Sequence, residues 1–270
     1  MPLAPETVEV DFIAPRHLAG GGDPAWITIP LHRACGWSHG NDPLMARVLL
    51  SSPDQKALLR LEPEPDGQWW TLHHAAEPDR PAWYASFGAL TPVELIAAVT
   101  DALTDPAATA STPSDPYEPL QQIGWSPASA DNGLVSPDGT AYVHRLGNAE
   151  EPGAWFFTAA LGPDRPVWQA RFGAHIPAYM VAAFTAALAD PKPVPRIDSG
   201  RSLPTRDPNV VSCRTADVLA VYVAGELEER VHSLAARRAT SPTSPIPSRQ
   251  PPPRTTAAAD PSAPSPHGST

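Results

Sequence analysis

Residues 70–106 read WTLHHAAEPDRPAWYASFGALTPVELIAAVTDALTDP, and residues 155–191 read WFFTAALGPDRPVWQARFGAHIPAYMVAAFTAALADP. The two stretches align without a gap, 85 positions apart, and 19 of the 37 aligned pairs are identical. An internal duplication of this kind indicates two copies of one structural unit. The shared residues are mainly Trp, Phe, Ala, Pro and Gly, which build cores and turns. The repeat therefore predicts a fold more clearly than a chemistry.

Each copy contains a strand pattern. Trp83, Ala85 and Phe87 alternate along the chain and recur at positions 168, 170 and 172, so the shared set lies on one face of a strand. We expect that face to be buried. Tyr84 and Ser86, which are not shared, should point outward.

A helical pattern follows the strand in each copy. Thr91 and Glu94 have the spacing of a capping box with Pro92 at the first helical position. Ile176 replaces the capping Thr in the second copy, which we expect to cost roughly 1 kcal/mol. Both helices are predicted to end at Asp-Pro. The apolar stripes are Leu95, Ile96, Val99 and Leu103 in the first copy, and Met180, Val181, Phe184 and Leu188 in the second.

These patterns predict an α+β fold of two tandem repeats, each a roughly four-stranded antiparallel meander with a C-terminal helix, followed by an extra helix and a disordered tail. A short helix that starts at Pro30 or Pro119 should open each repeat, and residues 6–13 alternate like an edge strand. The expected segments are an N-terminal strand and Gly-rich loop (1–29), repeat unit 1 (30–106), a linker (107–118), repeat unit 2 (119–191), a Pro-rich linker (192–214), a helix (215–238) and a Pro/Ser/Thr-rich tail (239–270).

Charge and composition restrict the partners. Residues 1–191 carry a net charge of −13 and residues 192–270 a net charge of +3. An acidic body repels phosphate backbones, which disfavours nucleic acid. The apolar runs are too short to span a membrane. Cys35 and Cys213 occur in very different regions, so we expect free thiols and a cytoplasmic location.

The predicted helix 215–238 carries an apolar stripe that includes Leu227, Val231 and Leu234, and Glu226 is spaced to pair with Arg230. Two arrangements fit the stripe. It can dock onto the repeat body, or it can form a homodimer with a second copy. The spacing does not choose between them.

Candidate binding residues are few. His73 and His74 occur in one copy only, but neighbouring strand residues face opposite ways, and no metal-binding spacing joins them to His32, His39 or Cys35. The Gly-rich loop at 15–24 lacks a phosphate-binding signature and is interpreted as a turn. Catalytic spacings are absent too, so we assign no catalytic, cofactor or metal residue and favour a non-enzymatic role. The candidate interaction residues are Trp37, Trp69, Trp125, His73, His74, Leu227, Val231 and Leu234.

Several short motifs co-occur over residues 8–191: Pro-Arg-His-Leu-Ala-Gly-Gly-Gly-Asp at 15–23, Gly-Trp at 36–37, Ser-Pro-Asp at 52–54, and the paired Pro-x-Trp-x-Ala-x-Phe stretch leading into a helix. Together they resemble an actinobacterial family known as domain of unknown function 317. The resemblance implies a cytoplasmic protein with two copies of the domain. It brings no activity, cofactor or catalytic residue.

Three functions remain open. The first is a non-catalytic protein-interaction module, which the lack of catalytic spacings favours. The second is a nucleic-acid accessory protein that uses the tail arginines Arg237, Arg238, Arg249 and Arg254. The third is a ligand-binding or enzymatic domain with a pocket between the repeats.

Overall fold

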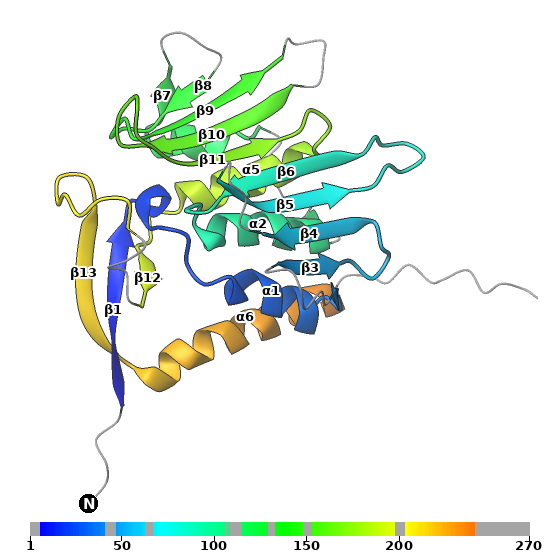
Figure 1. The fold of residues 1–270 in the computed structure, drawn as a ribbon, viewed down its shortest axis with the longest axis horizontal. Coiled ribbons are helices and arrows are strands. Elements are labelled where there is room, and N and C mark those ends of the chain that lie inside the picture. The colour runs from blue at the N-terminus through cyan, green and yellow to red at the C-terminus, as the bar shows by residue number, and fades with distance from the viewer. Residues whose placement is uncertain are drawn as a thin grey trace, which may run out of the picture.

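The computed structural model describes residues 6–40, 47–62, 67–105, 107–108, 115–128, 133–147, 153–197 and 203–240. Its largest element is one continuous antiparallel sheet in the order β2-β3-β4-β5-β6-β11-β10-β9-β8-β7 (Figure 1). The strands are β2 (Ser38–Gly40), β3 (Val48–Ser51), β4 (Ala57–Leu61), β5 (Gln68–His74), β6 (Trp83–Gly88), β7 (Ser126–Pro127), β8 (Gly133–Val135), β9 (Ala141–Leu146), β10 (Ala154–Ala160) and β11 (Pro166–Phe172).

The strand order reflects the duplication. The first repeat supplies β2–β6 and the second β7–β11, and the two halves join where β6 pairs with β11. The predicted meander is confirmed in each half, with a very short fifth strand at the outer edge. The sequence left open whether the repeats share a sheet, and the structure shows that they do.

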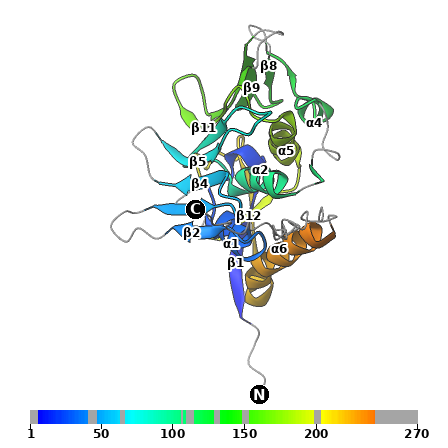
Figure 2. The ribbon, with the colours of Figure 1, turned by 90° about the vertical axis from the view of Figure 1, so that its right-hand side faces the viewer.

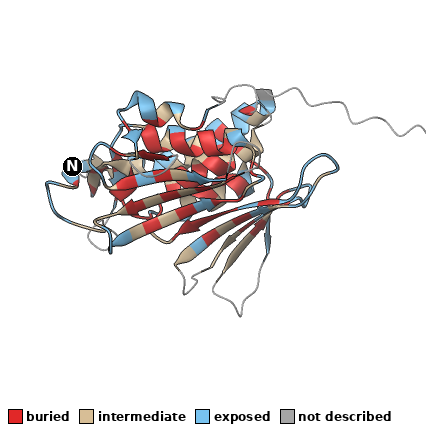
Figure 3. Ribbon diagram, turned by 90° about the horizontal axis from the view of Figure 1, so that it is seen from above, coloured by how far each residue is buried: buried red, intermediate tan, exposed pale blue. Residues whose placement is uncertain are grey.

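Helices cover one face of this sheet. They are η1 (Arg16–Leu18), α1 (Ala25–Arg33), α2 (Val93–Thr104), α4 (Glu118–Gln122), α5 (Ala178–Ala189) and α6 (Ala220–Thr240). The repeat helices α2 and α5 pack against each other. Figures 2 and 3 show the helices on one side of the strands and the opposite face of the sheet turned away from them. None of the described helices is long and apolar enough to cross a membrane.

The core follows the repeat pattern. Trp83, Ala85 and Phe87 and their counterparts in β11 are buried, while Tyr84 is 47% exposed. Ser86 lies on the outward side as predicted but is buried at the centre of the sheet. Phe184 of α5 packs against both Phe87 and Phe172 (6.0 and 5.2 Å between ring centroids). The junction of the two repeats is thus filled by aromatic rings on the helix-covered side of the sheet.

A second sheet has the order β12-β1-β13, with β1 (Thr7–Ala14), β12 (Val194–Arg196) and β13 (Ser212–Leu219). Three predictions fail here. Residues 6–13 do not form an edge strand, because β1 lies between two others. The linker predicted at 192–214 contains β12 and the start of β13. The final helix begins at Ala220 rather than at 215, because residues 212–219 pair with β1 instead. Residues 241–270 of the predicted tail lie outside the described part of the chain.

The first short helix also begins earlier than expected. α1 starts at Ala25, so Pro30 lies inside it rather than at its beginning. The Asp23 side chain accepts a hydrogen bond from the Ala25 N–H (2.8 Å), which satisfies one of the free donors of the first turn. The second short helix, α4, begins at Glu118 with Pro at its second position, close to the prediction.

Candidate interaction surfaces

The Gly-rich loop after η1 closes onto the start of α2. The carbonyl of Gly21 accepts the Val93 N–H (2.7 Å), and a Cβ on Gly21 would lie 2.6 Å from the carbonyl oxygen of Ala89. Arg196 of β12 donates to the carbonyls of Ala19 and Gly20 (both 3.1 Å). The carbonyl groups of the loop therefore accept hydrogen bonds from other parts of the same chain. Its glycines allow the loop backbone to lie close to the backbone that precedes α2.

The same arginine explains why the predicted capping box does not form. Both carboxylate oxygens of Glu94 bind the Arg196 guanidinium (2.6 and 2.9 Å) instead of the helix backbone. The N-cap is Pro92, and the fully buried Thr91 hydroxyl has no hydrogen-bond partner among the residues that the structure describes. The capping prediction is wrong, and so is the predicted cost of Ile176. An apolar residue suits this buried position.

Each Ser-Pro-Asp turn is built the same way in both copies. Ser52 donates to Asp54 (2.6 Å) and its hydroxyl accepts the Ala57 N–H (2.9 Å). Ser136 does the same with Asp138 (2.5 Å) and Ala141 (2.9 Å). Local hydrogen bonding thus accounts for these shared polar residues.

The second turn also contacts the segment that precedes α1. His17 is buried, and its Nε2 lies 2.7 Å from the Thr140 hydroxyl and 3.5 Å from Asp138. Burial of the Asp138 carboxyl favours its neutral form, but hydrogen bonds from His17, Ser136 and the Thr140 backbone outweigh this and hold the pKa of Asp138 well below its ordinary value. Arg16 next to it binds Asp190 (2.7 Å). These groups border a hollow of about 550 Å³.

The corresponding hollow in the first repeat has a volume of about 300 Å³ and is bordered by Asp54, Cys35 and Arg238 of α6. Burial raises the pKa of the Cys35 thiol. Desolvation and nearby Asp11 raise the pKa of Cys213 as well. Raised thiol pKa values give little thiolate near neutral pH, so neither free cysteine is activated as a nucleophile.

α6 docks onto the helical layer through Arg230. Pro30 has no N–H to offer the carbonyl of Trp26 one turn earlier, and Arg230 donates to that oxygen instead (2.9 Å). The guanidinium also binds both oxygens of Asp101 (2.8 and 3.1 Å) and lies 5.2 Å from the centre of the Trp26 ring. The predicted pair between Glu226 and Arg230 is therefore replaced by a long-range contact.

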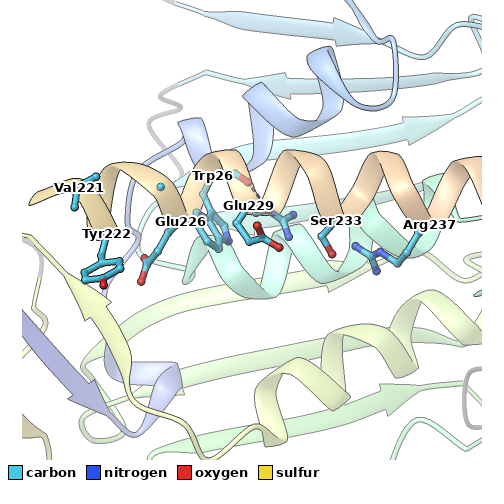
Figure 4. Close-up of a pocket in the computed structure, with 9 residues that line it drawn as sticks. Trp26, Val221, Tyr222, Glu226, Glu229, Ser233 and Arg237 are labelled. Carbon is cyan, nitrogen blue, oxygen red and sulfur yellow. Dashed lines mark hydrogen bonds between the residues drawn. The ribbon is translucent and has the colours of Figure 1, made fainter. Parts of the chain in front are cut away.

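The apolar stripe of α6 takes part in the same docking. Val231 and Leu234 are buried, and Leu227 is half-buried. A homodimer through this stripe would require α6 to leave the body. On its outer side, α6 and Trp26 border a hollow of about 660 Å³, along which Tyr222, Glu226 and Arg237 lie (Figure 4).

The opposite face of the large sheet, which we call the open face, has an unusual composition. The ten strands contain no Asp, Glu or Lys, although the chain has 29 Asp and Glu. Arg60 and Arg171 lie on this face, and they belong to one row of residues that face each other across seven strands. That row is Leu49, Arg60, Thr71, Ser86, Arg171, Phe156 and His144.

Aromatic residues extend the open face on both sides of this row. Beside the row, His73 stacks on Tyr84 (6.3 Å between centroids), and within the row His144 stacks on Phe156 (5.2 Å). Tyr84 is 47% and Tyr142 42% exposed. The face thus combines aromatic, aliphatic and neutral polar side chains with two arginines, in a chain that is acidic overall. Arg60 lies 3.4 Å from the carboxylate of Glu62, which follows β4.

The tryptophans and histidines among the predicted interaction residues divide into three groups. Trp37 and Trp125 are buried and anchor the core. Trp69 is 38% exposed, and His73 lies on the open face beside Tyr84. His74 stacks on Trp83 (5.2 Å), a buried residue of the helix-covered face, so the two histidines diverge as predicted. Among the described residues, no group of three His, Cys, Asp or Glu side chains is placed to hold a metal ion.

Sequence reasoning missed the contacts of four residues that organise these surfaces: Arg16, His17, Arg196 and Arg230. For the first two a signal existed, since both occur in one copy only, within the Pro-Arg-His motif. The partners of Arg196 and Arg230 lie 102 and 129 residues away, and no local pattern indicates them.

Comparison with known families identifies the repeated unit. Residues 51–109 and 135–194 match the SPDY domain, a domain of unknown function (DUF317). Comparisons with curated proteins and with solved structures gave no match. The matched segments include both Ser-Pro-Asp turns and both repeat helices. Each repeat therefore contains one segment that matches the SPDY (DUF317) model.

Proposed function

We propose that the protein is a non-catalytic interaction module that binds a partner protein on the open face of its ten-stranded sheet. The observation that carries this proposal is the composition of that face: aromatic, aliphatic and neutral polar side chains, two arginines, and no carboxylate or lysine on any of the ten strands. Protein interfaces are enriched in aromatic residues and Arg, and depleted in Lys, Glu and Asp.

The size of the open face suits such a role. Ten strands at the usual spacing span roughly 43 Å, and the central strands are roughly 20 Å long. The resulting area is roughly 800 Å², which is what one partner contributes to an interface of standard size. Tyr84 and Tyr142 are the exposed anchors, one in each repeat.

The charges indicate the kind of partner. Arg60 and Arg171 are three strands apart in the same row, about 14 Å from each other. A protein surface with carboxylates set among apolar residues complements this arrangement. Nucleic acid fits less well, because the remainder of residues 1–191 is strongly acidic and repels phosphates. Of the tail arginines, Arg237 binds Asp101 (3.2 Å), and Arg249 and Arg254 lie outside the described residues.

The test is capture of partners from a lysate of the source organism by three tagged chains. They are the wild type, Arg60→Glu/Arg171→Glu on the open face, and Arg80→Glu/Arg165→Glu in the turns before β6 and β11 as a control with the same change in charge. We expect a protein that both the wild type and the control retain, that resists nuclease, and that the open-face variant loses. Equal capture by all three chains, or capture that nuclease abolishes, would contradict the proposal.

A further inference from the structure

The outer edges of the two sheets differ in their protection. β2 has three residues, β7 has two, and β12 has three with Pro195 at its centre. Short or proline-bearing edge strands prevent pairing with other chains. β13 is different: it has eight residues and no proline, and β1 is its one neighbour among the described strands (Figure 1). Its outer edge is therefore long and regular.

The ladder with β1 decides which backbone groups point toward that edge. Ala220 donates its N–H to the carbonyl of Glu6 (2.9 Å). Hydrogen-bonded pairs alternate along an antiparallel ladder, so the even-numbered residues of β13 bond to β1. The odd-numbered residues then present their N–H and C=O groups outward. These residues are Cys213, Thr215, Asp217 and Leu219.

The charges beside this edge are unbalanced. Glu9 lies directly opposite Asp217, and both side chains are exposed. Like charges in this position destabilise an antiparallel pair. Neither carboxylate has an ion-pair partner among the described residues. Asp11 lies on the same face, where it accepts the Thr215 hydroxyl (2.5 Å). A cation next to Asp217 would relieve the repulsion.

We propose that β13 binds an extended segment of a partner protein that carries Lys or Arg at alternate positions. The segment extends the small sheet by one strand, its backbone pairs with the outward groups, and its cations lie beside Glu9 and Asp217. A second copy of the chain is disfavoured, because antiparallel pairing of two β13 strands would bring a second set of the same carboxylates to the same face. This edge is separate from the open face.

The probe is a fluorescein-labelled peptide that alternates lysine with valine and threonine, titrated into the full chain and followed by fluorescence anisotropy. We expect saturable binding that weakens with salt, and none to a matched peptide with glutamate in place of lysine. Thr215→Pro should weaken binding at least roughly tenfold, since it removes an outward N–H and no backbone hydrogen bond to β1. It also removes the hydrogen bond from the Thr215 hydroxyl to Asp11 of β1. Asp217→Lys should weaken it similarly without touching the backbone.

Four results would overturn the proposal. The lysine peptide does not bind, it binds as well as the glutamate peptide, it binds both variants like the wild type, or the wild-type chain sediments as a dimer that Thr215→Pro makes monomeric. The last result would assign the edge to a second copy. Circular dichroism checks the fold of Thr215→Pro, and Asp217→Lys tests the charge argument should that variant unfold.

Discussion

Replacement of Arg230 by alanine should detach α6 from the body. The side chains of Arg230 and Asp101 are 15% and 14% exposed, and their contact is bidentate. Removal of one partner from a largely buried ion pair costs about 3–5 kcal/mol. Arg237 still neutralises part of the Asp101 charge. Loss of the Arg230–Asp101 pair should therefore cost about 3 kcal/mol, the lower end of this range. The carbonyl of Trp26 also loses its donor, which adds about 1 kcal/mol. The expected total is about 4 kcal/mol.

Arg237→Ala is the matched control, because Arg237 lies on the same helix and binds the same carboxylate but is 45% exposed. Such an exposed pair contributes at most about 1 kcal/mol. Hydrogen exchange of the α6 amides in the native protein measures the free energy of opening, and urea unfolding reports on the body. Equal protection of α6 in the two variants would refute the assigned role of Arg230.

Three further changes test the structural account. Thr91→Val should raise the free energy of unfolding by about 1 kcal/mol, since it removes an unpaired buried hydroxyl, whereas a true cap would make it lower. Gly21→Ala should destabilise the fold by about 1–3 kcal/mol, because the new Cβ would collide with a backbone carbonyl. Gly225→Ala in α6 should stabilise the fold, because its Cβ would meet no other atom. Thermal unfolding of the two variants distinguishes these effects. Asp138→Asn should destabilise at neutral pH. The lowered pKa of Asp138 means that its contribution is present above the unfolded-state value of about 4 and is lost as the pH falls further, so the difference between the variants should shrink in acid denaturation series.

The elements that the sequence predicted are those whose pattern is local. The alternation around Trp83 and the stripes of α2 and α5 each need only a few consecutive residues, and the duplication supplies a second, independent copy of every pattern. The symmetry of the sheet was not predictable in the same way. It depends on the pairing of β6 with β11, and no pattern within one repeat indicates which strand of the other repeat it meets.

The failures occur where a distant partner decides the outcome. We expected a helix from residue 215, but pairing with β1, about 200 residues earlier, makes Ser212–Leu219 a strand. Glu94 has the spacing of a cap, but Arg196 provides a stronger, charge-assisted partner. Exposed Trp69 and buried Trp37 look alike in sequence, because burial of a tryptophan depends on what covers it.

The most direct test of the central claim is a photo-cross-linking experiment in cells of the source organism. A photoreactive phenylalanine analogue replaces Tyr84 on the open face in one chain and the exposed Gln122 of α4, on the helical side, in another. A discrete protein adduct from position 84 that is absent from position 122 is the predicted result. Adducts from position 122 alone, or none from position 84, would contradict the assignment of the open face as the docking surface.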